Sequence, residues 1–286
     1  MQQKVLVTGA TGFIGNYVVQ ELLQRNYDVI ATSSSNNKAS ATEWFDKVKY
    51  IPFNFNEFDT SINYFNFFQQ PDIVIHLAWE GLPNYKESFH LTKNLPLQKE
   101  FLQNLLQNGL KDLTVTGTCF EYGMKDGCLT ETMECEPANP YAIAKNELRK
   151  ELEKLTATHN CSLKWARLFY MYGKGQSPKS LISQLDVALE KGDAVFNMSG
   201  GEQVRDFLSI EKVADYIITI AIQQKVAGVI NCCSGLPVTV KQFVNEYLQS
   251  KNKAIQLNLG YYPYPDYEAM SFWGDNRKLK SIIKEL

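Results

Sequence analysis

The sequence predicts an α/β fold: a doubly wound parallel sheet with a smaller carboxyl-terminal lobe. Two observations predict it. Apolar, strand-like runs alternate with helical patterns through the first two thirds of the chain, and a glycine-rich turn follows the first run. Helices that alternate with parallel strands supply the crossover connections and cover both faces of the sheet. The expected strands are Val5–Thr8, Asp28–Thr32, Lys49–Phe53, Ile73–Ala78, Leu113–Gly117 and Ser162–Leu168.

The glycine-rich turn has the spacing Gly9-x-x-Gly12-x-x-Gly15 and leads into a helix with one apolar face. Gly9 permits a tight turn, Gly12 lets the backbone approach a pyrophosphate, and Gly15 lets the helix pack close to the strand. Free N–H groups and a partial positive charge at the start of the helix favour an anion. We therefore expect a Rossmann-type domain that binds a dinucleotide.

The composition argues against two kinds of partner. The chain has 286 residues, 44% of them hydrophobic, which is enough for a large core. A net charge of −2 and a pI of about 6.0 give no basic surface for nucleic acid. No apolar stretch has the length of a membrane span, and the early first strand leaves no room for a signal peptide. We expect a soluble cytoplasmic protein.

The six cysteines show neither CxxC pairs nor the His-flanked spacing of a zinc site. We therefore expect no metal site. The cysteines are interpreted as small buried residues in a reducing compartment.

The chain after residue 168 leaves the regular alternation and is predicted to build a second lobe. Gly173–Pro178 begins it, Ile217–Gln223 and Val229–Cys232 indicate a return to the sheet domain, and the tail after Gly235 is expected to be loop-rich. The predicted division is a dinucleotide-binding domain over residues 1–168 and about 206–234, and a substrate-binding lobe over about 169–205 and 235–286. A ligand is expected in the crevice between them.

A tyrosine and a lysine in the second of two long predicted helices indicate catalysis. The helices are expected over about Asn84–Asn108 and Pro140–Thr158, and Tyr141 and Lys145 share one face of the second. A lysine cation favours the tyrosinate, so we expect Lys145 to lower the pKa of Tyr141 and make it a usable acid. Thr118 follows the preceding strand, at the carboxyl edge where active-site groups of such sheets gather.

With the glycine turn, these residues resemble the extended short-chain dehydrogenase/reductase family of nucleotide-sugar epimerases, dehydratases and reductases. The resemblance covers about residues 1–234 in the family's order. Its marks are Thr8–Gly15, His76–Ala78, Asn94, Thr118 with Tyr122 and Gly123, Tyr141 with Lys145, Arg167–Gly173, and Arg205–Phe207. It implies a nicotinamide dinucleotide as cofactor and a nucleotide-diphosphate sugar as substrate.

The resemblance assigns roles to these residues. Thr118, Tyr141 and Lys145 would form the catalytic triad, with Lys145 also on the nicotinamide ribose, and Asn94 would organise a proton relay. Cofactor contacts are expected at Gly9, Thr11, Gly12, Phe13, Ile14, Gly15, Ser33, Ser34, Lys38, Asn54, Leu77, Ala78, Asn94, Thr116, Tyr141, Lys145 and Leu168.

Substrate contacts are expected at Trp79, Glu80, Thr118, Tyr170 and Arg205. The guanidinium of Arg205 suits a diphosphate, and an ion pair with Asp206 is the alternative. Tyr170 stands where many epimerases have Asn. Trp79 replaces a small residue and is expected to narrow the sugar pocket.

The end of the second strand favours NADP(H) over NAD(H). An Asp or Glu there would accept hydrogen bonds from both ribose hydroxyls of NAD and repel a 2′-phosphate. The chain instead offers hydroxyl groups and a cation, at Ser33, Ser34 and Lys38.

The residues after Thr118 disfavour two of the family's reactions. Dehydratases carry Asp-Glu there, where this chain has Cys119 and Phe120, and Glu121 would face the other way if the strand continued. Reductases that also epimerise C3 and C5 use a Cys at the position of Phe120 and a His near Gln184, and this chain has neither. Simple reduction and 4-epimerisation remain.

We favour an NADPH-dependent reductase of the C4 keto group of a nucleotide-linked 4-keto-6-deoxyhexose, with dTDP as the favoured nucleotide, in deoxysugar synthesis for bacterial surface polysaccharide. The segments His76–Tyr85 and Thr116–Gly123 resemble those of dTDP-4-keto-6-deoxyglucose reductases. An NAD-dependent 4-epimerase and a non-catalytic NADP(H)-binding regulator stay open as alternatives. Family members often pair the two long helices across a two-fold axis, so a homodimer is expected.

Overall fold

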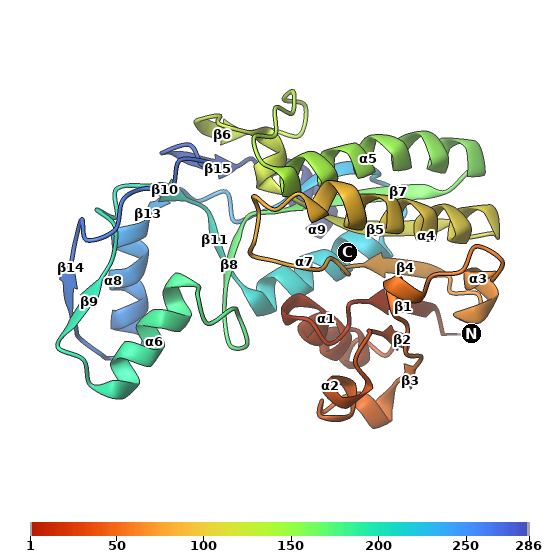
Figure 1. The fold of residues 1–286 in the computed structure, drawn as a ribbon, viewed down its shortest axis with the longest axis horizontal. Helices are drawn as coiled ribbons and strands as arrows, with labels where there is room; N and C mark the ends of the chain where they lie inside the picture. The colour runs from red at the N-terminus through yellow and green to blue at the C-terminus, as the bar shows by residue number, and fades with distance from the viewer. Residues whose placement is uncertain (1, 285–286) are drawn as a thin grey trace.

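The computed structural model describes residues 2–284, and its centre is a seven-stranded sheet in which all neighbouring strands are parallel. The strand order is β12-β7-β5-β4-β1-β2-β3, so the chain starts inside the sheet and winds outward in both directions (Figure 1). This confirms the predicted doubly wound α/β fold. The strands are β1 Lys4–Thr8, β2 Asp28–Thr32, β3 Lys49–Tyr50, β4 Ile73–His76, β5 Asp112–Thr118, β7 Ser162–Leu168 and β12 Gly228–Cys232.

Helices cover both faces of the sheet (Figure 1). The helices are α1 Phe13–Gln24, α2 Asn36–Ser40, α3 Tyr64–Phe67, α4 Leu95–Gln107, α5 Pro140–His159, α6 Leu181–Lys191, α7 Ile210–Ile222, α8 Val240–Ser250 and α9 Arg277–Ile283, with short turns η1 Phe45–Lys47, η2 Phe55–Glu57, η3 His90–Asn94 and η4 Cys119–Tyr122. Along β1, Val5 and Val7 are buried in the core that contains α1 and α7, whereas Leu6 is buried in the core that contains α4 and α5. This alternation is the two-residue period of a strand covered on both faces.

The second lobe packs α6 against α8 around an apolar core of its own. The prediction of a loop-rich tail is wrong for α8, which has the apolar spacing of a helix and is capped by the Thr239 hydroxyl, a hydrogen-bond acceptor from the Gln242 N–H at 3.1 Å. At the end of the chain, Leu279 and Ile282 of α9 return to the core beside α7. The remaining strands are β6 Gly127–Leu129, β8 Tyr170–Tyr172, β9 Val195–Asn197, β10 Val204–Arg205, β11 Phe207–Ser209, β13 Val238–Thr239, β14 Gln256–Asn258 and β15 Phe272–Gly274.

The first long helix begins later than its apolar pattern predicts. Residues 84–88 form turns, in which the Asn84 N–H donates to the Gly81 carbonyl and the Glu87 N–H donates to the Asn84 carbonyl. The π-turn η3 follows, and α4 begins only at Leu95. The His90 imidazole accounts for part of this difference, because it also binds the Asn84 carbonyl, at 3.0 Å.

All six cysteines are free. Cys119, Cys232 and Cys233 are buried and Cys135 and Cys161 are partly buried, but Cys128 is exposed, so the interpretation of all six as buried residues is wrong for Cys128. Within residues 2–284, no helix combines the length and the apolar character that a membrane span requires.

Candidate active site

The glycine turn between β1 and α1 leaves room only for glycine at two points. Gly9 has a φ of +69°, and a Cβ there would lie 2.9 Å from the Ala78 backbone nitrogen. A Cβ at Gly15 would collide with the Gly9 carbonyl oxygen. Gly12 precedes α1 without a side-chain cap, so the first turn of the helix keeps N–H groups available to a ligand. The turn therefore fits the diphosphate of a dinucleotide.

A cleft of about 480 Å³ opens on this turn, at the carboxyl ends of the parallel strands. The segments that follow β1, β4, β5 and β7 line it together with the start of α5. Of the residues expected at the cofactor or the substrate, the lining includes Gly9, Gly12, Phe13, Ile14, Gly15, Leu77, Trp79, Thr118, Tyr141, Leu168 and Tyr170. Trp79 lies in this cleft with its ring centroid 5.9 Å from that of Tyr141, and its narrowing of the sugar pocket stays a prediction.

Thr118 is fixed by a reciprocal cap at the end of β5. Its hydroxyl oxygen accepts a hydrogen bond from the Phe120 N–H at 3.3 Å, and the Glu121 carboxylate accepts one from the Thr118 N–H at 2.8 Å. Because β5 ends at this cap, the strand does not continue to Glu121, and the cap places this side chain, which lines neither cleft.

Glu121 is fully buried beneath the site, which sequence reasoning missed. Its carboxylate accepts hydrogen bonds from Trp165 Nε1 at 2.9 Å and Arg167 Nε at 2.8 Å, both on the neighbouring strand β7. The Thr-x-x-Glu spacing from Thr118 is the signal of a capping box that could have found it.

Tyr141 and Lys145 lie on the first turns of α5, where the Asn139 side chain accepts a hydrogen bond from the Ala142 N–H at 2.9 Å. Both catalytic candidates are buried. The Lys145 ammonium donates to the Thr116 carbonyl oxygen at 2.9 Å. This bond brings the end of α5 that carries the tyrosine against the end of β5.

The electrostatics of the pair differ from the expectation. Burial raises the pKa of Tyr141 above its usual range, and its hydrogen bond with Thr118 opposes that rise. Burial also lowers the pKa of Lys145 to about 7, against the effect of Glu121. The expected lowering of the Tyr141 pKa is therefore wrong for this structure, because burial of the phenol raises it.

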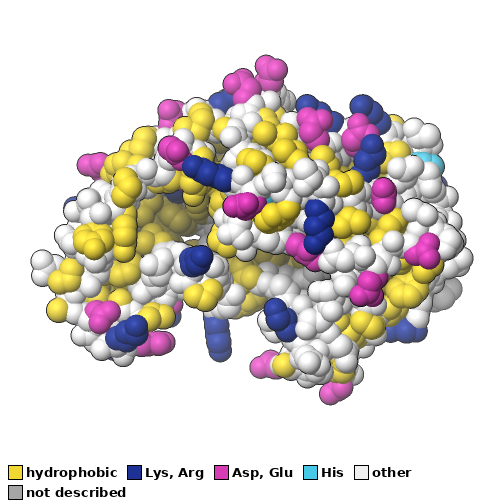
Figure 2. Space-filling model, viewed as in Figure 1, with side chains coloured by type: hydrophobic (Ala, Val, Ile, Leu, Met, Phe, Trp, Pro, Cys, Tyr) yellow, Lys and Arg dark blue, Asp and Glu magenta, His cyan; other side chains and the backbone are white. Residues whose placement is uncertain are grey.

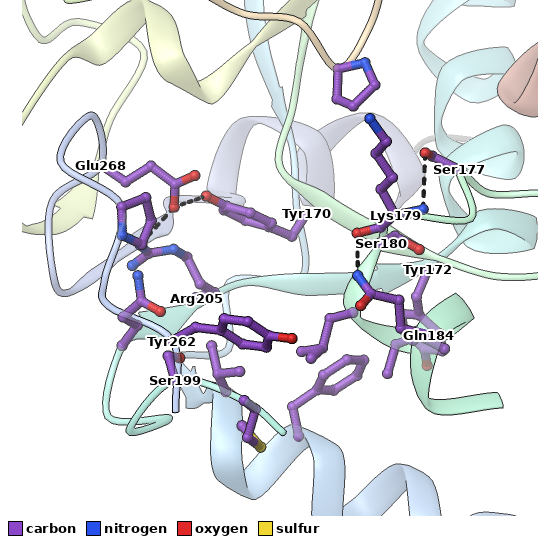
Figure 3. Close-up of a pocket in the computed structure, with 18 of the residues that line it drawn as sticks. Tyr170, Tyr172, Ser177, Lys179, Ser180, Gln184, Ser199, Arg205, Tyr262 and Glu268 are labelled. Carbon is purple, nitrogen blue, oxygen red and sulfur yellow. Dashed lines mark hydrogen bonds and ion pairs between the residues drawn. The ribbon is translucent and has the colours of Figure 1, made fainter. Parts of the chain in front are cut away.

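A second cleft of about 560 Å³ lies between the sheet domain and the lobe, where Figure 2 shows the surface hollowed. In Figure 3, Arg205, Tyr170 and Glu268 stand on one side of it, while Lys179 and Gln184 stand on the other. Arg205 Nη2 lies 2.8 Å from a Glu268 carboxylate oxygen, and the Tyr170 hydroxyl donates to the same oxygen at 2.6 Å.

The alternative pairing of Arg205 with Asp206 is wrong. The Asp206 carboxylate accepts hydrogen bonds from the backbone N–H groups of Ser234 and Gly235. The partner of Arg205 is Glu268, 63 residues further along the chain, and no sequence spacing indicates it.

Tyr85 lies where the two clefts meet. The sequence did not predict it as a site residue. It lines both clefts, as do Phe120 and Tyr170. Its carbonyl oxygen accepts a hydrogen bond from the Tyr141 N–H at 3.1 Å. A ligand in the second cleft can therefore reach the catalytic candidates in the first.

Other expected contacts lie outside the glycine-turn cleft. The Ser33 hydroxyl is 3.0 Å from that of Tyr50, and Lys38 is exposed on α2. Ser34 and Asn54 line a separate shallow pocket beyond β2. Thr11, Ala78 and Thr116 are absent from the cleft lining, although Ala78 touches Gly9 and Thr116 binds Lys145.

Glu80 forms an ion pair with Lys93 at 3.3 Å and lines neither cleft. The buried Asn94 amide donates to the Glu80 carbonyl oxygen at 2.9 Å, which fixes the side chain that is expected to organise a proton relay.

The family model of the NAD dependent epimerase/dehydratase family matches residues 5–233. The chain is 30% identical over 275 residues to dTDP-6-deoxy-L-talose 4-dehydrogenase (NAD(+)) of Aggregatibacter actinomycetemcomitans, covering 94% of this chain and 98% of that one. It is 22% identical to CDP-abequose synthase of Salmonella typhimurium, covering 99% and 93%.

Solved structures share the fold. MoeE5 in complex with UDP-glucuronic acid and NAD superposes with a TM-score of 0.81 at 24% identity, over 98% of this chain and 92% of that one. UDP-glucuronic acid 4-epimerase from Bacillus cereus gives 0.84 at 22% identity, over 99% and 93%. With the family match and the 30% identical relative, these results show that the chain belongs to the NAD-dependent epimerase/dehydratase family, the extended short-chain dehydrogenases/reductases.

Proposed function

We propose that this protein is an oxidoreductase that reduces the C4 keto group of a nucleotide-linked 4-keto-6-deoxyhexose, with dTDP as the favoured nucleotide. The observation that carries the proposal is that Thr118 and Tyr141 line the cleft of the glycine turn, while the buried Lys145 ammonium donates to the Thr116 carbonyl oxygen, two residues before Thr118. The positions after Thr118 hold Cys119 and Phe120, so the acid and base that a dehydration needs are not there. The name of the 30% identical relative describes a redox reaction at C4 of a dTDP-linked 6-deoxy sugar.

A bound nicotinamide dinucleotide supplies the hydride, and the glycine turn would hold its diphosphate. The buried Tyr141 hydroxyl stays protonated at neutral pH because its pKa is raised, so it can protonate the developing alkoxide. The Lys145 ammonium stabilises the tyrosinate that this proton transfer leaves. The Thr118 hydroxyl accepts from the Phe120 N–H and is hydrogen bonded to Tyr141, and it would turn its proton to the substrate oxygen when the sugar is bound.

The released cofactor tests the proposal against its alternatives. The purified protein is denatured, the released nucleotide is identified, and NADPH oxidation is followed with dTDP-linked 4-keto-6-deoxyglucose. We expect protein largely free of cofactor that oxidises NADPH in proportion to product. Tightly bound NAD with interconversion of 4-epimers would establish the epimerase. NADPH binding without turnover of any nucleotide-linked 4-keto sugar would favour the regulator.

We further propose NADP(H) as the cofactor, with its 2′-phosphate near Ser33, Ser34 and Lys38. Ser33→Asp places a carboxylate there, and repulsion over a few ångströms costs about 1–3 kcal/mol, which is roughly 5- to 150-fold in affinity. We expect NADPH to bind more weakly and the preference over NADH to shrink, measured by fluorescence titration of both cofactors. Ser40→Asp, at the exposed end of α2, is the control. An unchanged ratio would place the phosphate elsewhere or identify NAD(H) as the cofactor.

A homodimer through α4 and α5 is proposed from the family resemblance. The two helices lie side by side (Figure 1), and Lys99 on α4 pairs with Glu151 on α5 at 2.9 Å. Phe101 and Leu148 face the core of the same chain, so the outer faces of the helices would have to meet. Light scattering at micromolar concentration is expected to give twice the chain mass of 32.6 kDa. The mass of a single chain would contradict the dimer and leave the catalytic assignment intact.

A further inference from the structure

Within residues 2–284, the ammonium of Lys145 has two direct contacts, with the Thr116 carbonyl oxygen and with the Trp79 ring. Lys145 is 2% exposed, its ammonium donates to the Thr116 carbonyl oxygen, and the Trp79 ring lies over the nitrogen at 4.1 Å from the ring centroid. A buried ammonium that lacks a direct carboxylate partner is costly to keep charged. The face of an indole ring attracts a cation, and the attraction grows when water is excluded.

The indole ring is held in this position by His90. Trp79 Nε1 lies 3.0 Å from His90 Nδ1, and the two rings are nearly parallel, at 20°. An indole N–H can only donate, so Nδ1 of His90 accepts. His90 Nε2 must then carry the proton, which it donates to the Asn84 carbonyl oxygen at 3.0 Å. The Asn94 amide nitrogen, 3.4 Å from Nδ1, is a second donor to the same acceptor. The contacts therefore define one neutral tautomer of His90.

The backbone around His90 supports this arrangement. His90 and Asn94 are the first and last residues of the π-turn η3, and both are buried. Single π-turns are rare and are frequent at functional sites. The ring of His90 also lies 5.3 Å from that of Tyr141, so the turn faces the catalytic candidates directly.

We propose that Trp79 and His90 are positioning residues for Lys145: the His90 imidazole fixes the indole, and the indole face stabilises the charged ammonium beside Tyr141. The inference rests on the proposed function in one respect, that Lys145 must be charged to stabilise the Tyr141 oxygen during turnover. The hydrogen bond between Trp79 and His90 and the contact between the Trp79 ring and Lys145 are present without substrate, so they can be tested independently of the proposed function.

The titratable groups around Lys145 do not by themselves keep its ammonium charged. Glu121, below the end of β5, raises the pKa of Lys145, while burial lowers it to about 7. His76 on β4 and His90 on η3 interact with Lys145, and the pKa of each is lowered, chiefly by burial. Both imidazoles are therefore neutral near pH 7, and Tyr141 is protonated. Besides Glu121 and the Thr116 carbonyl oxygen, the Trp79 face is the attraction for the cation that these neighbours supply.

The first test is the pH dependence of sugar reduction in Trp79 variants. Reduction by the unchanged protein should decline above neutral pH as Lys145 loses its proton. In Trp79→Leu, loss of the aromatic face should lower the Lys145 pKa, so the decline in rate should begin about half to one pH unit lower. Trp79→Phe keeps an aromatic face and should shift it less, and Trp273→Leu, which changes a residue that lines neither cleft, should not shift it. An unshifted limb in a folded Trp79→Leu protein would overturn the proposal.

The second test reads the pair without substrate. The chain has only three histidines, so nitrogen-15 NMR of the imidazoles can resolve His90. We expect the Nε2–H tautomer in the unchanged protein, and a higher His90 pKa in Trp79→Phe, because the donor to Nδ1 is lost. The pH profile of sugar reduction tests the same pair. His90→Asn keeps an acceptor near the position of Nδ1, so its profile should lie closer to that of the unchanged protein than the profile of His90→Phe does.

The outcomes separate the two proposals. An Nδ1–H tautomer of His90 in the unchanged protein would overturn the positioning pair, whatever the enzyme catalyses. Absence of turnover with every nucleotide-linked 4-keto sugar would remove the proposed function, and the His90 spectra would still decide the pair. Turnover with an unshifted pH limb would defeat the positioning role alone.

Discussion

Tyr141→Phe is expected to lower kcat for sugar reduction roughly a hundredfold or more, because it removes the group that protonates the alkoxide. The phenol is buried, with its hydroxyl hydrogen bonded to Thr118, so no water takes its place easily. Binding of the cofactor should change little, since the glycine turn that holds the diphosphate is separate. Steady-state kinetics and a fluorescence titration of NADPH measure the two effects.

Tyr261→Phe is the matched control for this substitution, because Tyr261 is 59% exposed and lines neither cleft. It should leave kcat unchanged. Full turnover by a folded Tyr141→Phe protein would remove Tyr141 from the mechanism.

Glu121→Gln is expected to lower the free energy of unfolding by about 3–5 kcal/mol, the usual cost of breaking a buried ion pair at one partner. The substitution leaves the guanidinium of Arg167, 1% exposed, without the carboxylate that it contacts at 2.8 Å. It also replaces the acceptor that caps the Thr118 N–H. Urea unfolding followed by circular dichroism measures the change.

Glu147→Gln makes the same chemical change in an exposed pair with Lys150, where both side chains are nearly half exposed. Exposed pairs contribute about 0–1 kcal/mol, so this control should unfold close to the unchanged protein. Equal destabilisation by the two substitutions would show that Glu121 does not hold the strands below the site together.

The sheet and the placement of the two catalytic candidates on one helix face were predictable because each depends on short spacings. Val5, Leu6 and Val7 alternate between two cores, and such apolar runs predict buried parallel strands. Tyr141 and Lys145 are one helical turn apart, so the helix alone places them on one face. The positions of the strand residues and of the tyrosine–lysine pair both follow from geometry within one short segment.

The remaining parts of the site depend on contacts between distant segments. Arg205 meets Glu268 across 63 residues, and the spacing of neither residue reveals the other. The sign of the Tyr141 pKa shift depends on how completely the phenol is buried, which spacing to Lys145 cannot tell. The late start of α4 depends on the turn bonds that Asn84 makes with its neighbours.

Deuterium transfer tests the central claim most directly. The protein is incubated with dTDP-linked 4-keto-6-deoxyglucose and NADPH that carries deuterium at the transferred position, and the product sugar is analysed by NMR and mass spectrometry. We predict one deuterium at C4 of the sugar and one equivalent of oxidised cofactor per product. Unlabelled product, or a 4-epimer formed without net oxidation of the cofactor, would contradict the assignment as a 4-ketoreductase.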